Sequence, residues 1–395
     1  MQLYDELVWR GLIKEVSDPE VEKKLNTESV NFYIGTDPTG DSLHIGHLSS
    51  FLICNRLKNA GHNPYILIGG GTGLIGDPKP DAERPMITKE EVLHNCDDLT
   101  KQIKEIFGFE VVNNYDWLMD INFIDYLRDY GKHFPLGYML NKDIVKRRME
   151  EGITYTEFSY MLMQAVDFLY LYENKNITFQ VAGQDQWGNI TAGIELIRKK
   201  IGKRAYGLTM PLLLRKDGTK FGKTASGTSV WLSKDRTPVY DFYQFFYNTD
   251  DDVVIDYLKR FTFLSKEEID SIEEEHLKHP EQRLASKTLA YEITKFVHGE
   301  DEADLAKKTS EEIFTSGVAS NMPSIEITKN AEYHILDLLV DSELVASKSE
   351  ARRLIEQGGI SLDSNKITDV NYLVKDMDEV IIQKGKKTYL KVIFK

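Results

Sequence analysis

Four short apolar runs, separated by stretches with helical periodicity, constrain the fold of this 395-residue chain most strongly. They lie at residues 30–34, 64–69, 177–181 and 208–214. Continuous apolar runs of this length are typical of parallel strands buried on both faces. Parallel neighbours need right-handed crossovers, which here are helical. The sequence therefore predicts an α/β fold, with a doubly wound, Rossmann-like parallel sheet in a catalytic domain over residues 1–236.

The helices expected in this first part follow from apolar residues that recur every three to four positions. One of them opens with a capping box, in which Thr154 precedes Glu157 by three residues. The expected helices cover residues 2–16, 47–60, 89–106, 120–128, 139–151, 155–172 and 188–200.

The strand signal disappears after residue 236, which predicts a change of domain. A helical domain is expected over residues 237–314, and a linker rich in small and polar residues over 315–330. Residues 331–395 combine two short helical segments with strand-like runs, which predicts a small α+β domain. The helices of the middle domain are expected at 240–247, 252–260, 266–275, 281–297 and 301–314.

Composition excludes several classes of protein. A net charge of −14 argues against a protein that coats nucleic acid without specificity, because such affinity comes from neutralising phosphates with Lys and Arg. Cys54 and Cys96 are the two cysteines, too few for a disulfide framework or a zinc cluster. No apolar run approaches the roughly 18 residues of a membrane span. We therefore expect a cytoplasmic protein that holds no metal of its own and binds no membrane.

The turn after the first strand, residues 36–43, leads into a helix that starts near two histidines. His44 and His47 are three positions apart, at a helix N-terminus whose free N–H groups favour anions. A phosphate site is one interpretation. Two histidines at this spacing are also common as ordinary surface or core residues.

A second stretch, residues 220–224, reads Lys-Phe-Gly-Lys-Thr and follows a Lys-Asp-Gly-Thr turn. Two lysines hinged by a glycine could close over a polyphosphate as charge develops on the leaving group. Taken alone, this stretch is weak evidence for a phosphate site, since lysines in such stretches are usually on the solvated surface.

The helix expected from residue 155 is apolar almost all round, so polar side chains inside it need partners. Tyr160, Gln164 and Asp167 form one stripe, because they stand at i, i+4 and i+7. An unpaired buried polar group costs on the order of 1–3 kcal/mol. The stripe therefore meets either a ligand or an internal hydrogen-bond network.

Glycines between residues 69 and 76 could be taken for a dinucleotide fingerprint. The helix that this fingerprint requires does not follow at the right spacing. A glycine-rich floor that lets a substrate approach the backbone is the better interpretation.

Taken together, His-Ile-Gly-His at 44–47 and Lys-Phe-Gly-Lys-Thr at 220–224 resemble the two signatures of class I aminoacyl-tRNA synthetases. The second has the form used by the bacterial tyrosyl enzymes, and the resemblance covers nearly the whole chain. Residues 347–359 also resemble a small RNA-binding module shared with a ribosomal small-subunit protein.

This resemblance implies a tyrosine pocket and a nucleotide site. For tyrosine it assigns the ammonium group to Asp77, Tyr160 and Gln164, the phenol to Tyr33 and Asp167, and the carboxylate to Gln186. For ATP it implies Gly35, Asp37, Gly46, Gly183, Asp185, Lys223 and Thr224. The catalytic residues would be Thr39, His44, His47, Lys220 and Lys223.

The implied activity is tyrosine–tRNA ligation through a tyrosyl-adenylate, with Mg²⁺ arriving on ATP, a tyrosine-specific tRNA as partner and a homodimer as the assembly. Two departures from the family pattern concern Lys79, which lies in a shortened loop, and Ile34, which replaces a cysteine common in relatives. Three alternatives stay open: a tryptophanyl enzyme, an RNA-binding protein that keeps the shape without the chemistry, and another nucleotidyltransferase.

Overall fold

The structure is a computed structural model that describes residues 1–77, 87–142, 145–146, 148–149, 152–213, 229–316, 322–328, 332–363, 365–375, 377–385 and 388–395. The chain divides into two compact units. The first comprises residues 1–237 and 248–289, and the second comprises 238–247 and 290–395. The functional boundaries at residues 237, 315 and 331 remain predictions.

A six-stranded sheet forms the centre of the first unit, in the order β1-β6-β5-β2-β3-β4. Strands β2 to β6 are parallel, and β1 pairs antiparallel with β6 at one edge. The four strands expected from apolar runs are confirmed, but the fourth covers residues 206–210 and not the expected 208–214. The bounds are β1 (Glu15–Val16), β2 (Asn31–Thr36), β3 (Asn63–Ile68), β4 (Glu110–Asn113), β5 (Ile177–Gly183) and β6 (Tyr206–Met210).

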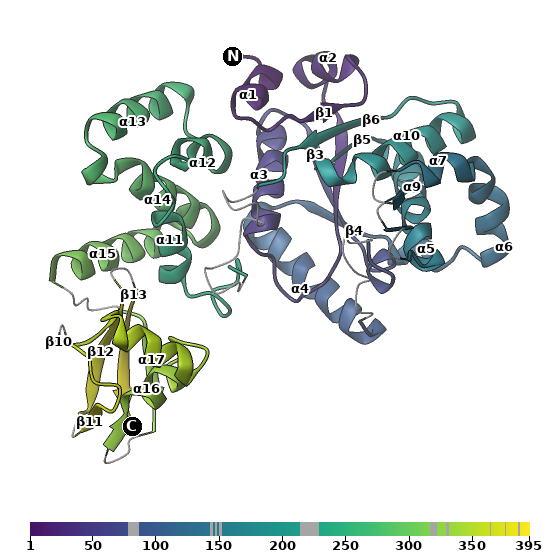
Figure 1. Ribbon diagram of the computed structural model, residues 1–395. Coiled ribbons are helices and arrows are strands. Elements are labelled where there is room, and N and C mark those ends of the chain that lie inside the picture. Colours follow the sequence, from purple (N-terminus) through teal and green to yellow (C-terminus); the bar gives the residue numbers. More distant parts are fainter. Residues whose placement is uncertain are drawn as a thin grey trace. The chain divides into compact units, whose positions relative to one another are not determined.

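The order of the strands places a topological switch point between β2 and β5. From β2 the chain proceeds outward to β3 and β4, whereas β5 lies on the other side of β2 and leads outward to β6. Right-handed crossovers in opposite directions put the connecting helices on opposite faces. Figure 1 shows α3 (Ile45–Asn59) and α4 (Lys89–Phe107) on one side and α9 (Tyr155–Lys175) and α10 (Trp187–Ile201) on the other. Ligands of such sheets bind at the carboxyl ends of the strands beside the switch point.

Helix α9 begins as its sequence predicts. Thr154 accepts a hydrogen bond from the Glu157 backbone, and the Glu157 side chain reaches back to Thr154, so the capping box is confirmed. Glu157 is buried and pairs with Arg148 at 3.0 Å, which supplies the cation that a buried carboxylate needs.

Several expected boundaries are wrong for local reasons. The first helix does not reach residue 16: α1 (Leu3–Trp9) ends at Arg10, because Gly11 takes a left-handed φ of 67°. A short β1 and α2 (Glu20–Thr27) follow it. The helix expected at 120–128 is broken into short turns, α6 (Phe123–Asp125), η2 (Tyr126–Tyr130) and η3 (Gly131–His133).

The first half of the chain contains further short helical elements. They are η1 (Thr72–Leu74), α5 (Tyr115–Leu118), α7 (Leu136–Leu140) and η4 (Gln184–Gln186). The first unit also contains α12 (Val254–Phe261), α13 (Lys266–Lys278) and η5 (Pro280–Gln282).

The second unit has its own sheet and core. Its helices begin with α11 (Val239–Tyr247) and α15 (Glu300–Ser316), and α14 (Leu284–His298) enters it at residue 290. A five-stranded sheet has the order β10-β9-β12-β13-β7, with a separate pair of β8 and β11. The bounds are β7 (Ser324–Ile327), β8 (Glu332–His334), α16 (Ile335–Asp341), α17 (Lys348–Glu356), β9 (Ile360–Leu362), β10 (Asn365–Lys366), β11 (Leu373–Lys375), β12 (Glu379–Lys384) and β13 (Thr388–Phe394).

The segment expected to be a linker, residues 315–330, contains a strand. Residues 324–327, placed in the linker by composition, form β7 and pair in parallel with β13. Across the described ranges of both units, no helix has the length and apolar character needed to cross a bilayer.

Candidate functional site

The two signature histidines cap the N-terminus of α3. His44 is the N-cap residue, and its Nδ1 accepts from the Gly46 N–H at 3.0 Å, while His47 Nδ1 accepts from the His44 N–H at 3.1 Å. The rings stack with centroids 3.9 Å apart. Because each Nδ1 is an acceptor, each neutral ring carries its proton on Nε2. The pair thus presents N–H donors at the positive end of a helix.

Burial of the His47 ring, together with the neighbouring His44, holds the pKa of His47 well below its usual value. His47 is therefore a neutral hydrogen-bond donor at physiological pH rather than a cation.

Glycine at position 46 is a steric requirement of this arrangement. A Cβ there would lie 2.8 Å from Cε1 and 2.9 Å from Nδ1 of His44, closer than real contacts allow. The backbone on the other side is held by residues 230–232: Ile45 N donates to Val230 O and Leu232 N donates to Leu43 O. Trp231 lies 6.0 Å from the His44 ring, centroid to centroid.

The glycines after β3 are packed closely against protein side chains, and the expected approach of a substrate to their backbone stays a prediction. A Cβ on Gly69 would lie 2.1 Å from the Asp37 carboxylate, and one on Gly73 would lie 2.9 Å from Pro38 Cδ. Asp37 accepts hydrogen bonds of 3.0 Å from the hydroxyls of Thr72 and Tyr160. Asp37 therefore links the floor to helix α9.

Asp167 is a buried carboxylate with partners of two kinds. It is 1% exposed and accepts from Asn114 Nδ2 at 2.9 Å and from Trp117 Nε1 at 2.8 Å. The pKa of Asp167 is raised to about 7. Burial is the largest cause, the two hydrogen bonds act in the opposite direction, and the Asp37 carboxylate adds to the increase. Two donors occupy only part of the acceptor capacity of a carboxylate, which has about four lone-pair sites, so Asp167 can accept further hydrogen bonds.

Two further buried polar groups, on the neighbouring strands β2 and β5, lack partners among the described residues. The Tyr33 hydroxyl and Gln180 Oε1 have no hydrogen bond within that part of the chain. Tyr33 and Gln180 are register partners on β2 and β5, so their side chains share one face of the sheet. Burial, and then the Asp167 carboxylate, raise the pKa of Tyr33. Unpaired buried groups are costly, which points to a polar ligand group at this place.

The raised pKa of Asp167 predicts a pH dependence of stability. An Asp titrates near 3.9 when unfolded, so between pH 4 and 7 the folded chain binds more protons than the unfolded chain. This stabilisation is fully present below about pH 4 and is lost as pH rises through about 7, a change of about 4 kcal/mol, of which about 3 kcal/mol falls between pH 5 and pH 8. Denaturant unfolding at pH 5 and pH 8 should show this loss in the ligand-free protein. It should be absent in Asp167→Asn, and equal slopes in both proteins would contradict the assignment.

At the mouth of the site, four polar side chains form a network between β3, α9 and α10. Gln186 Nε2 donates to Asp77 Oδ2 at 2.8 Å, and Asn189 Nδ2 donates to Gln164 Oε1 at 3.0 Å and to Gln186 Oε1 at 2.9 Å. The acceptors Asp77 and Gln164 therefore lie close together, an arrangement suited to an ammonium group.

The residues at the end of β5 are placed for contact with a ligand. Asp185 is exposed, and its carboxylate folds over Gly183, where a Cβ would lie 2.6 Å from Oδ1. Gly35 and Thr39, at the end of β2, are also exposed. These residues border the switch point, but nothing in the structure assigns a role to each.

Some expected site residues lie outside the described residues. They are Lys220, Lys223, Thr224 and Lys79. The site described above consists of the remainder, and their roles stay predictions from the sequence.

Sequence reasoning missed Thr72, Asn114, Trp117, Gln180 and Asn189. Asn114 and Trp117 follow β4, a strand with a weak signal, and hold Asp167. A polar residue directly after a recognised strand would have been a usable signal. Gln180 could have been found as the one amide within an apolar run.

Comparisons with known proteins agree over the whole chain. The family model for class I tRNA synthetases (W and Y) matches residues 25–315. The model for the tyrosine–tRNA ligase SYY-like C-terminal domain matches residues 314–392.

Among curated proteins, tyrosine–tRNA ligase 1 of Enterococcus faecalis is 47% identical over 98% of each chain. The tyrosine–tRNA ligase of Limosilactobacillus reuteri is also 47% identical, over 98% of this chain and 99% of its own. Among solved structures, a C-terminally truncated mitochondrial tyrosyl-tRNA synthetase of Coccidioides posadasii is 31% identical with a TM-score of 0.69, over 78% of this chain and 91% of its own.

Proposed function

This chain belongs to the class I tRNA synthetase family of tryptophanyl and tyrosyl enzymes, and from that premise we propose that it activates L-tyrosine with ATP and charges a tyrosine-specific tRNA. The observation that supports tyrosine most directly is the set of unsatisfied buried groups around Asp167. A phenol hydroxyl would donate to Asp167 and pair with Tyr33. An indole, whose N–H sits at a different place on a larger ring, would fit these groups less well.

The other end of tyrosine would lie at the mouth network. Because Tyr160 donates its proton to Asp37, its oxygen can still accept from an ammonium group, as can Asp77 and Gln164. Gln186 would then donate to the carboxylate. This places the tyrosine carboxylate at the carboxyl ends of β2 and β5, beside the start of α3.

In the proposed reaction the tyrosine carboxylate attacks the ATP α-phosphate, pyrophosphate leaves, and the tyrosyl group passes to the tRNA 3′ end. Protein nucleophiles have no role in these steps. His44 and His47 would donate hydrogen bonds as negative charge develops, together with Lys220 and Lys223. Gly35, Asp37, Thr39, Gly46, Gly183, Asp185 and Thr224 would contact the nucleotide.

Mg²⁺ would reach the site bound to ATP. Within the described residues there is no cluster of three or more His, Cys, Asp or Glu side chains suited to a metal. A metal carried by substrate phosphates is the usual arrangement for Mg²⁺.

Exchange of pyrophosphate into ATP tests the proposal with each of the twenty amino acids. We expect exchange to depend on tyrosine, with tryptophan inactive. Exchange supported by tryptophan would favour the tryptophanyl alternative, and failure to bind ATP would favour a protein that has kept the shape without the chemistry. A cytoplasmic location is part of the same proposal.

We also propose a homodimer, because large apolar side chains on α6, on α7 and at the start of α9 are exposed. Phe123 and Ile124 are 66% and 65% exposed, and Leu136 and Tyr155 are 66% and 67% exposed. We propose that these side chains form one apolar patch, since contiguous exposed apolar surface marks an interaction site. The occupant would be a second copy of this chain, since two-fold interfaces use the same patch on both partners.

Ile124→Glu should convert the dimer to a monomer, because it places a charge in the apolar patch of each partner. Light scattering coupled to size exclusion measures the change. Leu277→Glu is the matched control, since Leu277 is 76% exposed on α13. A dimer that survives Ile124→Glu, or one that Leu277→Glu dissociates equally well, would contradict this placement.

A further inference from the structure

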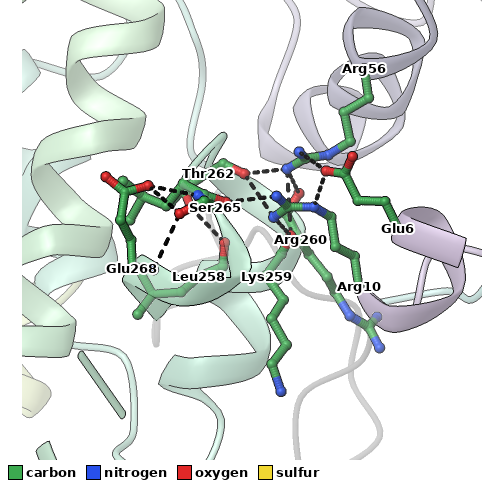
Figure 2. A network of polar contacts seen from close by, with 10 residues as sticks. Glu6, Arg10, Arg56, Leu258, Lys259, Arg260, Thr262, Ser265 and Glu268 are labelled. Carbon is green, nitrogen blue, oxygen red and sulfur yellow. Dashed lines mark hydrogen bonds and ion pairs between the residues drawn. The ribbon is translucent and has the colours of Figure 1, made fainter. Parts of the chain in front are cut away.

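Two buried arginines of the first unit hold the C-terminal end of α12 (Figure 2). Arg10 follows the last turn of α1 and is 4% exposed, and Arg56 lies in the last turn of α3 and is 5% exposed. Neither contacts the tyrosine pocket described above. Both point to the chain that joins α12 to α13.

The guanidinium groups donate to backbone oxygens that the helix end leaves unpaired. Arg10 donates to Lys259 O at 2.8 Å and to Leu264 O at 2.7 Å. Arg56 Nη2 donates to Thr262 O, and its Cζ lies 4.6 Å from the centre of the Phe263 ring. The carbonyl groups contacted in total are those of Lys259, Arg260, Thr262 and Leu264.

One carboxylate cannot balance the two arginine charges of this cluster, so the arginines also need the carbonyl groups at the end of α12. Glu6 lies 2.7 Å from Arg10 and 3.7 Å from Arg56, so one carboxylate faces two guanidinium groups. The excess positive charge lies at the negative end of the α12 dipole. Burial, and then the Arg10 charge, lower the pKa of Arg56 to about 9, while Glu6 raises it. The two arginines therefore depend on the position of α12, and α12 on theirs.

Helix α3 connects this cluster to the signature histidines. Its 15 residues form a rod, with His44 capping its first turn and Arg56 in its last. At 1.5 Å per residue such a rod is about 22 Å long, so a tilt at one end displaces the other. A misplacement of about 1 Å can cost about 100-fold in rate. The proposed tyrosine contacts lie on β2, on α9, in η4 and at Asp77 after η1, so none of them is on α3 and tyrosine binding should not follow its tilt.

We propose that Arg56, supported by Arg10 and Glu6, is a positioning residue for the activation step. It anchors the far end of α3 to the end of α12 and so fixes where the two histidines meet the nucleotide. The inference rests on the proposed function of the histidines.

The test compares Arg56→Met with Lys58→Met. Lys58 is in the same last turn but donates to Gly108 O at 2.9 Å rather than to α12. We expect Arg56→Met to lower kcat of pyrophosphate exchange about tenfold, which is about 1.4 kcal/mol. The dissociation constant of tyrosine should stay within twofold. Titrating active sites by tyrosyl-adenylate formation ensures that the rate refers to folded protein. Lys58→Met should match the wild type.

If Arg56→Met does not fold, Arg56→Lys replaces it, because lysine keeps the charge but cannot bridge several carbonyl groups. An unchanged kcat per active site, or an equal weakening of tyrosine binding, would overturn the proposal and leave Arg56 a structural residue. Failure of the proposed function would be seen separately, as a wild-type protein without tyrosine-dependent exchange.

Discussion

Asp167→Asn is expected to lower kcat/KM for tyrosine about 100-fold and to leave the low value for phenylalanine nearly unchanged, since a hydrogen bond to a charged group contributes about 1.5–3 kcal/mol. The carboxylate is fixed by Asn114 and Trp117 and still has acceptor capacity. An amide at this position offers one oxygen to the donors around it and turns an N–H₂ group toward the others. Tyrosyl enzymes are the standard example of selectivity against phenylalanine through a contact to the substrate hydroxyl, and we propose that Asp167 makes that contact in this chain.

Pyrophosphate exchange with each amino acid measures the ratio. Asp116→Asn is the matched control, because it removes the same charge beside Trp117 from an exposed position. We expect the control to leave the ratio of tyrosine to phenylalanine intact. A ratio that Asp167→Asn does not change would remove Asp167 from the phenol site and support an internal hydrogen-bond network instead.

The raised pKa of Asp167 allows a second test of its proposed contact with the tyrosine hydroxyl. The pH dependence of kcat/KM reports the pKa values of groups in the free enzyme. The Asp167 pKa of about 7 should therefore appear as a decrease of kcat/KM for tyrosine on the acid side of the pH profile. Below about pH 7 the protonated group accepts less strongly, so kcat/KM should fall with pH. Asp167→Asn should lack this decrease.

The parts of the fold that carry strong periodic signals were predictable. The runs at β2, β3 and β5 are buried on both faces and read as continuous apolar stretches. The capping box of α9 also fixed its first residue. By contrast β1 has two residues and β4 has four, too few for a period to be visible. Strand β7 depends on pairing with β13, a partner more than sixty positions away, which local sequence does not encode.

The candidate site was predictable where residues share one element. Tyr160 and Asp167 stand on one face of α9, so their spacing brought them to attention, whereas Asp37 was expected only from the family resemblance. The structure adds the link between Asp37 and Tyr160, whose hydroxyl donates at 3.0 Å. Asn114 and Asn189 could not be found in the same way, because their contacts with Asp167 and Gln164 cross between elements. Such contacts depend on the order of the strands in the sheet.

His44→Ala is expected to slow tyrosine-dependent exchange about 100-fold at saturating substrate, the usual cost of removing one preorganised donor from a transition state. The ring is held by its own Nδ1 contact to Gly46 N, by stacking on His47 and by Trp231 behind it. These contacts hold the ring rigidly at the start of α3. Tyrosine binding should not change, since its proposed contacts lie on other elements.

His44→Asn separates the two functions of this side chain. Asparagine is a strong N-cap residue and should still accept from Gly46 N, so α3 should begin normally and the thermal midpoint should stay close to that of the wild type. It cannot supply the Nε2 donor, so most of the rate should still be lost. His47→Asn makes the same comparison for the second ring, because the asparagine oxygen can take the place of the Nδ1 that accepts from His44 N while the Nε2 donor is lost. If His44→Asn recovers the full rate, the histidine serves only to cap the helix, and the chemistry must come from other donors at the end of the sheet.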